Sequence, residues 1–115
     1  MRLEALRAFA LAQPQTTVVK QWGEHLVFKV AGKMCLIVAL YGSLAEGVTF
    51  KCRPDEFDGL TEIDGITQAP HCAKRHWVHV GDLDAITSAE LQRLIRHSYD
   101  LVVAKLPKKI QAALA

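Results

Sequence analysis

The 115-residue sequence lacks the marks of several protein classes. It has only three cysteines, Cys35, Cys52 and Cys72, and no C-x-x-C pair, so a reducing, cytoplasmic setting is the simplest expectation. Its longest apolar run, CLIVALYGSLA, is too short and too interrupted by glycine to cross a bilayer. Glu4 and Arg7 break the apolar run near the start, which argues against a signal peptide. We therefore expect a cytoplasmic protein that does not enter membranes.

A large net charge is also absent. Fourteen Lys and Arg residues oppose twelve Asp and Glu residues, which gives a formal net charge of +2. A protein that coats nucleic acid nonspecifically is far more basic, so binding to a polyanion would depend on local clusters of cations. Half of the residues are hydrophobic and 23% are charged, which is typical of a globular chain, and the length fits one domain over residues 1–115.

The first half of the sequence predicts one helix and a series of strands. Apolar residues at helical spacing indicate an amphipathic helix over residues 2–12, which Pro14 ends. Alternating and β-branched residues predict consecutive strands over residues 16–40, separated by glycine turns. Gly42 and Gly47 bracket an expected loop, and GVTFKC follows as a strand. Together these strands would form an antiparallel meander.

The second half predicts two helices, a last strand and a short terminal helix. Pro54 followed by acidic residues is a helix-start signal, and residues 61–69 are expected to be a loop. Thr87 and Glu90 form a T-x-x-E capping box before a long amphipathic helix that Pro107 ends. The predicted fold is a single two-layer α+β domain, with helices on one face of an antiparallel sheet of about five strands.

The segment APHCAKRHWVHV concentrates residues that could bind a metal, namely His71, Cys72, His76 and His79. Their H-C-x3-H-x2-H spacing is not that of a zinc site. We expect KRHWVHV to be a strand, in which alternation puts His76, Val78 and Val80 on one face and Trp77 and His79 on the other. His76 and His79 could not then share one ion. We predict neither a metal nor a cofactor.

Motifs of enzymatic chemistry are missing as well. The sequence has no G-x-S-x-G motif, no Cys–His–Asn signature around Cys72 and no phosphate-binding loop at VAGKM. Ser98 is expected to hydrogen-bond within its own helix, and Tyr99 to pack its ring while its hydroxyl stays in water. We predict no catalytic residue and no enzymatic activity.

Three segments in order resemble the MmcQ/YjbR-like family of small bacterial proteins: WGEHLVFKVAGKMCLIVAL, ITQAPHCAKRHWVHV and ELQRLIRHSYDLVVAKLPKK. The most specific marks are VAGKM at 30–34, Lys51 in TFKC, the strand with Trp77, and SYDLVVAKLP at 98–107. The resemblance implies a compact double-wing fold, in which hairpins flank the helices. It also implies DNA binding without catalytic activity, because members are generally described as DNA-binding proteins.

The sequence departs from this family at two places. Cys35 stands where the family usually has an aromatic residue, which concerns core packing. The AKRHW segment is more basic and richer in imidazole than is typical, which favours an anion-binding surface.

The candidate nucleic-acid contacts are the cations that a small sheet could bring to one rim: Lys33, Lys51, Arg53, Lys74, Arg75, His76, Lys105 and Lys108. Trp77 fits either a stacking platform or a core residue. An alternative function is a protein-interaction or small-ligand adaptor whose sheet face or edge receives a partner, which the even charge balance favours. An enzyme using Cys72 or a histidine is a third, weaker hypothesis. The DNA target and the oligomeric state are not encoded in any recognisable pattern.

Overall fold

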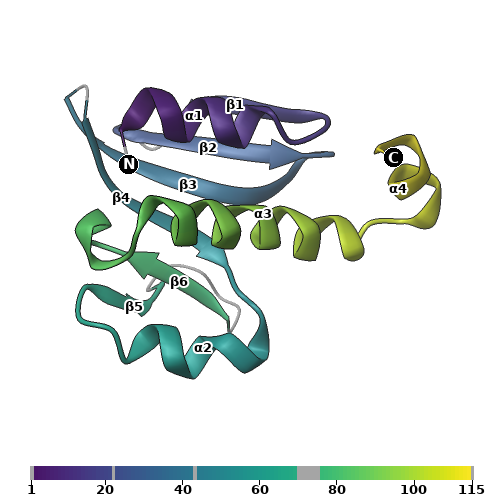
Figure 1. Ribbon diagram of the computed structural model, residues 1–115. Helices are drawn as coiled ribbons and strands as arrows, with labels where there is room; N and C mark the ends of the chain where they lie inside the picture. Colours follow the sequence, from purple (N-terminus) through teal and green to yellow (C-terminus); the bar gives the residue numbers. More distant parts are fainter. Residues whose placement is uncertain (1, 22, 43, 70–75, 115) are drawn as a thin grey trace.

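A computed structural model describes residues 2–21, 23–42, 44–69 and 76–114. Its helices are α1 (Leu3–Leu11), α2 (Pro54–Thr61), α3 (Ser88–Ala104) and α4 (Lys108–Leu114), with a short 3-10 helix, η1 (Leu83–Ala85). Its strands are β1 (Thr16–Gln21), β2 (His25–Val30), β3 (Lys33–Tyr41), β4 (Leu44–Lys51), β5 (Ile66–Gln68) and β6 (Trp77–Val80). Figure 1 shows how these elements are arranged.

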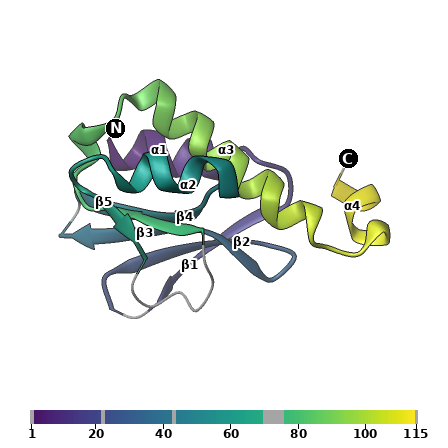
Figure 2. The same cartoon turned by 90° about the horizontal axis from the view of Figure 1, so that it is seen from below.

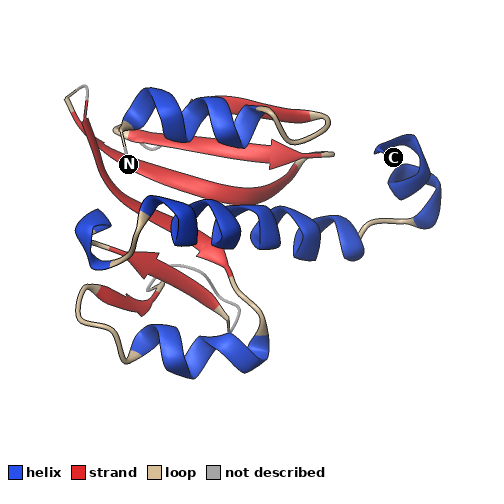
Figure 3. Ribbon diagram, viewed as in Figure 1, coloured by secondary structure: helices blue, strands red, loops and turns tan. Residues whose placement is uncertain are grey.

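The described strands form one open sheet in the order β1-β2-β3-β4-β6-β5, and every neighbouring pair is antiparallel. Helices α1, α2 and α3 lie on one face of this sheet (Figure 2). Figure 3 shows α4 beyond the end of α3, at the side of the sheet. The predicted two-layer α+β arrangement is confirmed. No helix in the described ranges has the length and apolar character needed to span a bilayer.

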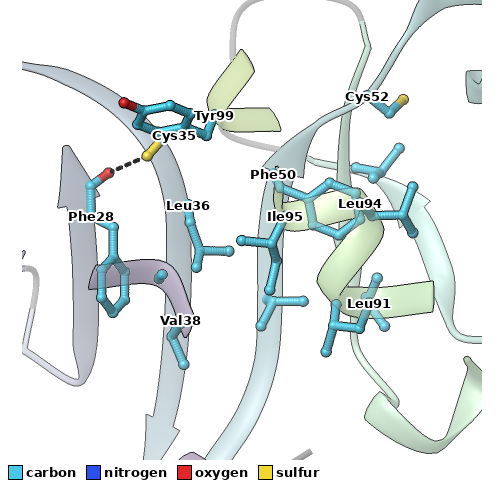
Figure 4. Packing of buried hydrophobic residues seen from close by; sticks show 14 of the residues in the cluster. Phe28, Cys35, Leu36, Val38, Phe50, Cys52, Leu91, Leu94, Ile95 and Tyr99 are labelled. Atoms are coloured by element: carbon cyan, nitrogen blue, oxygen red, sulfur yellow. Dashed lines mark hydrogen bonds between the residues drawn. The ribbon is translucent and has the colours of Figure 1, made fainter. Parts of the chain in front are cut away.

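The core fills the space between the sheet and the helices. Figure 4 shows Leu94 and Ile95 of α3 packed close to Leu36 and Phe50 of the central strands. Alternation explains which strand residues enter the core, because residues two apart on a strand point to the same face. Burying a side chain of this size contributes about 1.5–3 kcal/mol. The central strands and α3 therefore supply much of the stabilising apolar contact.

One glycine and one short strand depart from the predictions. The loop expected between Gly42 and Gly47 is much shorter, because β4 already begins at Leu44. Gly47 lies within the strand, where a Cβ would come 2.8 Å from the carbonyl oxygen of Val80. This glycine therefore permits a close approach of β6 and does not mark a turn. The sheet also has six strands, because the predicted loop at 61–69 contains β5.

The last strand was predicted over residues 74–80, and in the described residues it begins at Trp77 and leaves out His76. His76 has a φ of 76° and precedes β6, so the prediction that it shares a strand face with Val78 is wrong. Such a left-handed conformation costs a non-glycine residue free energy. In this protein it is adopted by the residue directly before β6. Val78 belongs to the core cluster, whereas Trp77 and His79 fall on the other face by alternation. Trp77 is only 8% exposed, which supports packing and not base stacking.

Ser98 and Tyr99 have partners that the sequence did not suggest. The hydroxyl of Ser98 donates to the carbonyl of Cys35 at 2.6 Å and accepts from the amide of Lys51 at 2.9 Å. The Tyr99 hydroxyl donates to the carbonyl of Pro14 at 2.7 Å. The expectation of a bond within the helix for Ser98 and a water-exposed hydroxyl for Tyr99 was therefore wrong. Both residues attach α3 to other elements.

The two described cysteines, Cys35 and Cys52, are free and buried. Burial raises the pKa of each thiol from 9.0 to about 11, and the nearby Glu56 carboxylate adds to the effect at Cys52. The Cys35 thiol contacts the carbonyl of Phe28 at 3.4 Å (Figure 4). Both side chains act as small hydrophobic core residues.

Candidate nucleic-acid interface

Four of the predicted contact residues meet at one end of the sheet. Antiparallel pairing brings the start of β3, the end of β4 and the start of β6 to the same end. Lys33 is the first residue of β3, and Lys51 is the last residue of β4. Arg53 follows β4 by two residues, and His76 directly precedes β6. We call this end of the sheet the Lys33 end. Strand pairing thus brings to one end of the sheet cations that lie far apart along the sequence.

Lys33 is held at the tip of the β2–β3 hairpin. Ala31 and Gly32 have φ values of 50° and 79°, so both central turn residues are left-handed, as a tight two-residue hairpin turn requires. Lys33 directly follows this turn and is exposed. Lys51 lies opposite Trp77 and is half-buried, and alternation from the buried Phe50 directs it to the face away from the helices.

Arg53 and His76 are both engaged by α2. The Arg53 guanidinium makes two hydrogen bonds to the Asp55 carboxylate, at 3.1 and 3.2 Å. Because both side chains are exposed, this pair contributes only about 0–1 kcal/mol, and a phosphate could compete for the guanidinium. The His76 ring meets the edge of Phe57 at a centroid distance of 5.5 Å, and the His76 carbonyl accepts from the Cys52 amide. His76 is therefore a packing residue.

Lys105 and Lys108 come to the same end from α3 and α4. Ser98 contacts both Cys35 and Lys51, and α3 continues past that contact toward Lys105, its C-cap. Helix α4 then begins with Lys108 and borders a hollow that the β2–β3 turn residues Ala31 and Gly32 also line. Both lysines are exposed. The remaining predicted contacts, Lys74 and Arg75, lie outside the described residues, as do His71 and Cys72.

An ion-pair network links α2 to α3 and was not anticipated. Arg93 donates to the Glu56 carboxylate at 2.8 Å and also pairs with Glu90, one turn earlier on α3. The hydrogen bond from Arg93 lowers the pKa of Glu90. Glu90 and Arg93 have a recognisable i,i+3 spacing, but Glu56 lies 37 residues away from Arg93, so the sequence gives no sign of the third member.

This network borders a small hollow with balanced charge. The hollow has a volume of about 240 Å³ and is lined by Arg53, His97, Asp100 and Leu101. His97 lies 3.8 Å from Glu56, and Asp100 lies 3.5 Å from Arg96. Cations and carboxylates alternate here, so this part of the surface is less suited to phosphate than the lysines at the Lys33 end.

His79 forms a side-chain hydrogen bond on the face of the sheet away from the helices. His79 Nδ1 lies 2.9 Å from the Thr49 hydroxyl on the neighbouring strand β4. Burial lowers the pKa of His79, with a smaller opposing effect from Glu46. Across the ranges that the structure describes, no three His, Cys, Asp or Glu side chains are placed to share a metal ion.

Comparisons with known proteins agree with this architecture. The YjbR family model matches residues 11–101. The Deinococcus radiodurans protein DR2400, described as a DUF419 domain, is 26% identical, with a TM-score of 0.86 over 97% of this chain and 86% of that chain. A Pseudomonas syringae protein, a Northeast Structural Genomics Consortium target, is 22% identical, with a TM-score of 0.70 over 88% of this chain and 98% of that one. The latter likeness concerns the fold alone. No curated protein matches the sequence.

Proposed function

The chain belongs to the YjbR family, and from that premise we propose that it is a cytoplasmic DNA-binding protein without enzymatic activity. In this proposal the Lys33 end of the sheet contacts backbone phosphates. The observation that carries it is the convergence of cations from separate elements, namely Lys33, Lys51, Arg53, Lys105 and Lys108. Of these, Lys51 is half-buried and the other four are exposed; Lys33 follows the β2–β3 turn, Lys105 caps α3 and Lys108 begins α4.

The chemistry of these side chains suits phosphate more than base edges. Lysine presents a compact charge on a flexible stem, which pairs with a phosphate without fixed geometry. Phosphate contacts position a protein on DNA but carry no sequence information. The described candidate contacts also lie on a turn and at strand and helix ends, and not along one exposed helix face that could enter the major groove. We therefore infer that binding depends little on base sequence.

Three potential nucleophiles among the residues that the structure describes support a non-enzymatic role, whereas Cys72 lies outside those residues. Ser98 is fully buried and uses its hydroxyl between two backbone groups. With pKa values of about 11, Cys35 and Cys52 stay protonated near neutral pH, and a thiol is a much weaker nucleophile than a thiolate. These three side chains are assigned to structure.

A duplex titration tests the proposal. A fluorescently labelled duplex of about 20 base pairs would be titrated with protein at ~50 mM and ~200 mM salt and followed by anisotropy. We expect micromolar or tighter binding at the lower salt, and an affinity that falls steeply at the higher salt, because each neutralised phosphate releases counterions. Two duplexes of unrelated sequence should bind within about threefold of each other. Absence of binding at micromolar protein and low salt would refute the proposal.

A further inference from the structure

The two edges of the sheet differ in what they offer to a partner. In the described part of the chain, β1 has a strand neighbour on one side only, and it presents six residues of edge. The opposite edge, β5, has three residues. Natural edges are commonly blunted by proline, bulges or several charges, whereas β1 reads TTVVKQ and carries a single charge, Lys20. Val19 on this edge is 43% exposed. β1 is thus the edge open to strand addition.

A hollow lies where β1 begins. Its volume is about 380 Å³, and its walls include Gln15 and Thr17 beside and on β1, Ala31 and Gly32 of the β2–β3 turn, and Ile110 and Leu114 of α4. Ile110 is 37% exposed there. Because Gln15 and Thr17 line it, the hollow lies at the end of the sheet where β1 begins, and the end residue of a strand added to β1 would be the one nearest to it. Strand addition commonly combines main-chain hydrogen bonds with a pocket for a side chain, and both are present together here.

The wall that α4 provides is held in place. The Gln111 side-chain amide donates to the carbonyl of Leu106 at 2.7 Å and to that of Ala104 at 3.4 Å. The Gln111 backbone amide also bonds to the carbonyl of Pro107 at 3.0 Å. These contacts satisfy carbonyls at the end of α3 and fix the turn between the two helices. The hollow therefore exists before any partner binds.

The charge around the hollow is positive. Lys33 follows Gly32, Lys29 pairs with Thr17, and Lys108 and Lys109 open α4. The lining residues include no carboxylate. β1 itself has neither an acidic residue nor a large apolar side chain that would complement this site, so a second copy of the same edge fits poorly.

We propose that the β1 edge and this hollow bind an extended, acidic peptide segment of another protein, which adds as a strand and inserts one apolar side chain between Thr17 and Ile110. This protein-interaction site adjoins the proposed contact with DNA at Lys33 and Lys108 and differs from it in using the β1 edge and the apolar hollow. An apolar hollow beside free main-chain groups suits a peptide, whereas a DNA backbone would use only the lysines.

The test uses isotope-labelled protein and a blocked heptapeptide of alternating glutamate and valine with leucine at each end. Amide chemical shifts should change along β1 and α4, with a Kd on the order of 0.1–1 mM. The same peptide with alternate backbone nitrogens methylated should bind at least about tenfold more weakly, because it cannot pair with the edge. Replacing both leucines with glycine should weaken binding about fivefold or more.

Matched protein variants locate the site. Ile110→Asn should weaken binding about fivefold or more, whereas Ile63→Asn should change it less than about twofold, since Ile63 is equally exposed at 37% but follows α2. Thr17→Trp, which fills the hollow from the β1 side and leaves the sequence of α4 unchanged, should also weaken binding. The inference is wrong if no β1 amide shifts at millimolar peptide, or if Ile110→Asn and Ile63→Asn behave alike. It is equally wrong if sedimentation shows a dimer and the β1 amide shifts change with protein concentration, since a second copy would then occupy the edge. Duplex DNA that shifts the same β1 amides would also overturn it.

Discussion

The Ser98 hydroxyl lies 2.6 Å from the carbonyl oxygen of Cys35 and replaces a bond of the β3–β4 ladder. Leu36 pairs with Phe50, so the next bond of the ladder would join Cys35 to Lys51. The serine instead accepts from the Lys51 amide and donates to the Cys35 carbonyl. A side chain of α3 thereby links β3 to β4 at the Lys33 end of the sheet.

Replacing Ser98 with alanine should destabilise the protein by about 1–3 kcal/mol. The change leaves two backbone groups without their partner, and Ser98 is fully buried, so water cannot easily substitute. Urea unfolding should show a lower midpoint with an unchanged slope. Ser88→Ala, at the exposed start of α3, is the control and should change stability by less than about 0.5 kcal/mol. Equal effects of the two substitutions would contradict the bridging role.

Tyr99→Phe should cost about 0.5–1.5 kcal/mol, because it removes the hydrogen bond to the Pro14 carbonyl and keeps the ring. That bond attaches α3 to the connection between α1 and β1, so amide exchange there should accelerate. Tyr41→Phe provides the comparison, since Tyr41 is 74% exposed on the β3–β4 hairpin. Thermal unfolding should distinguish the two variants. A Tyr99→Phe protein as stable as Tyr41→Phe would show that the contact contributes nothing.

The buried thiols predict a loss of stability at alkaline pH. The pKa values of Cys35 and Cys52 are raised from 9.0 to about 11, so the folded state retains protons that the unfolded state loses. Their stabilising contribution is complete below pH 9 and disappears as pH rises toward 11. Lysines and tyrosines titrate in the same range, so the informative quantity is the difference between the wild type and a double Cys→Ala variant. The unfolding free energy of the variant should fall less steeply with pH than that of the wild type. Equal slopes for the two proteins would show that the thiols do not contribute to the alkaline loss of stability.

His79 predicts a loss of stability on the acid side. Because burial lowers its pKa below the ordinary value of 6.5, the unfolded chain binds a proton that the folded chain binds less readily. This contribution is present above about pH 6.5 and is lost as the pH falls below it. In His79→Gln, the decline in unfolding free energy between about pH 7 and pH 5 should be shallower. An unchanged profile in His79→Gln would overturn the assignment.

The sequence predicted local structure well where a pattern repeats over many residues. The alternation of Val48, Phe50 and Cys52 identified a strand with one buried face, and all three are buried. The N-cap half of the predicted capping box is confirmed, since the Thr87 hydroxyl accepts from the Glu90 amide, whereas the Glu90 carboxylate pairs with Arg93. These features depend on neighbouring residues, which the sequence displays directly.

The errors concern partners that are distant in sequence. β5 has only three residues, too few for a recognisable period, and it exists because Ile66 pairs with Val80. Gly47 has the sequence context of a turn glycine, but its lack of a side chain is required by the Val80 carbonyl on the neighbouring strand. Ser98 and its partner Cys35 lie 63 residues apart. The candidate interface also depends on distant pairing: the sequence suggested that these cations could share one rim, and the antiparallel register shows which strand ends adjoin.

The contribution of the lysines can be isolated with two charge-matched triple variants. Lys33→Gln, Lys105→Gln and Lys108→Gln together remove three charges from the Lys33 end. If each contacts one phosphate, the slope of log K against log salt should become shallower by about 2–3, and duplex affinity at low salt should fall at least tenfold. Arg2→Gln, Arg7→Gln and Lys20→Gln remove the same charge from α1, its N-cap and the far end of β1. This control should keep the wild-type slope. Equal losses in both triple variants would mean that net charge alone governs binding, which would contradict a defined interface.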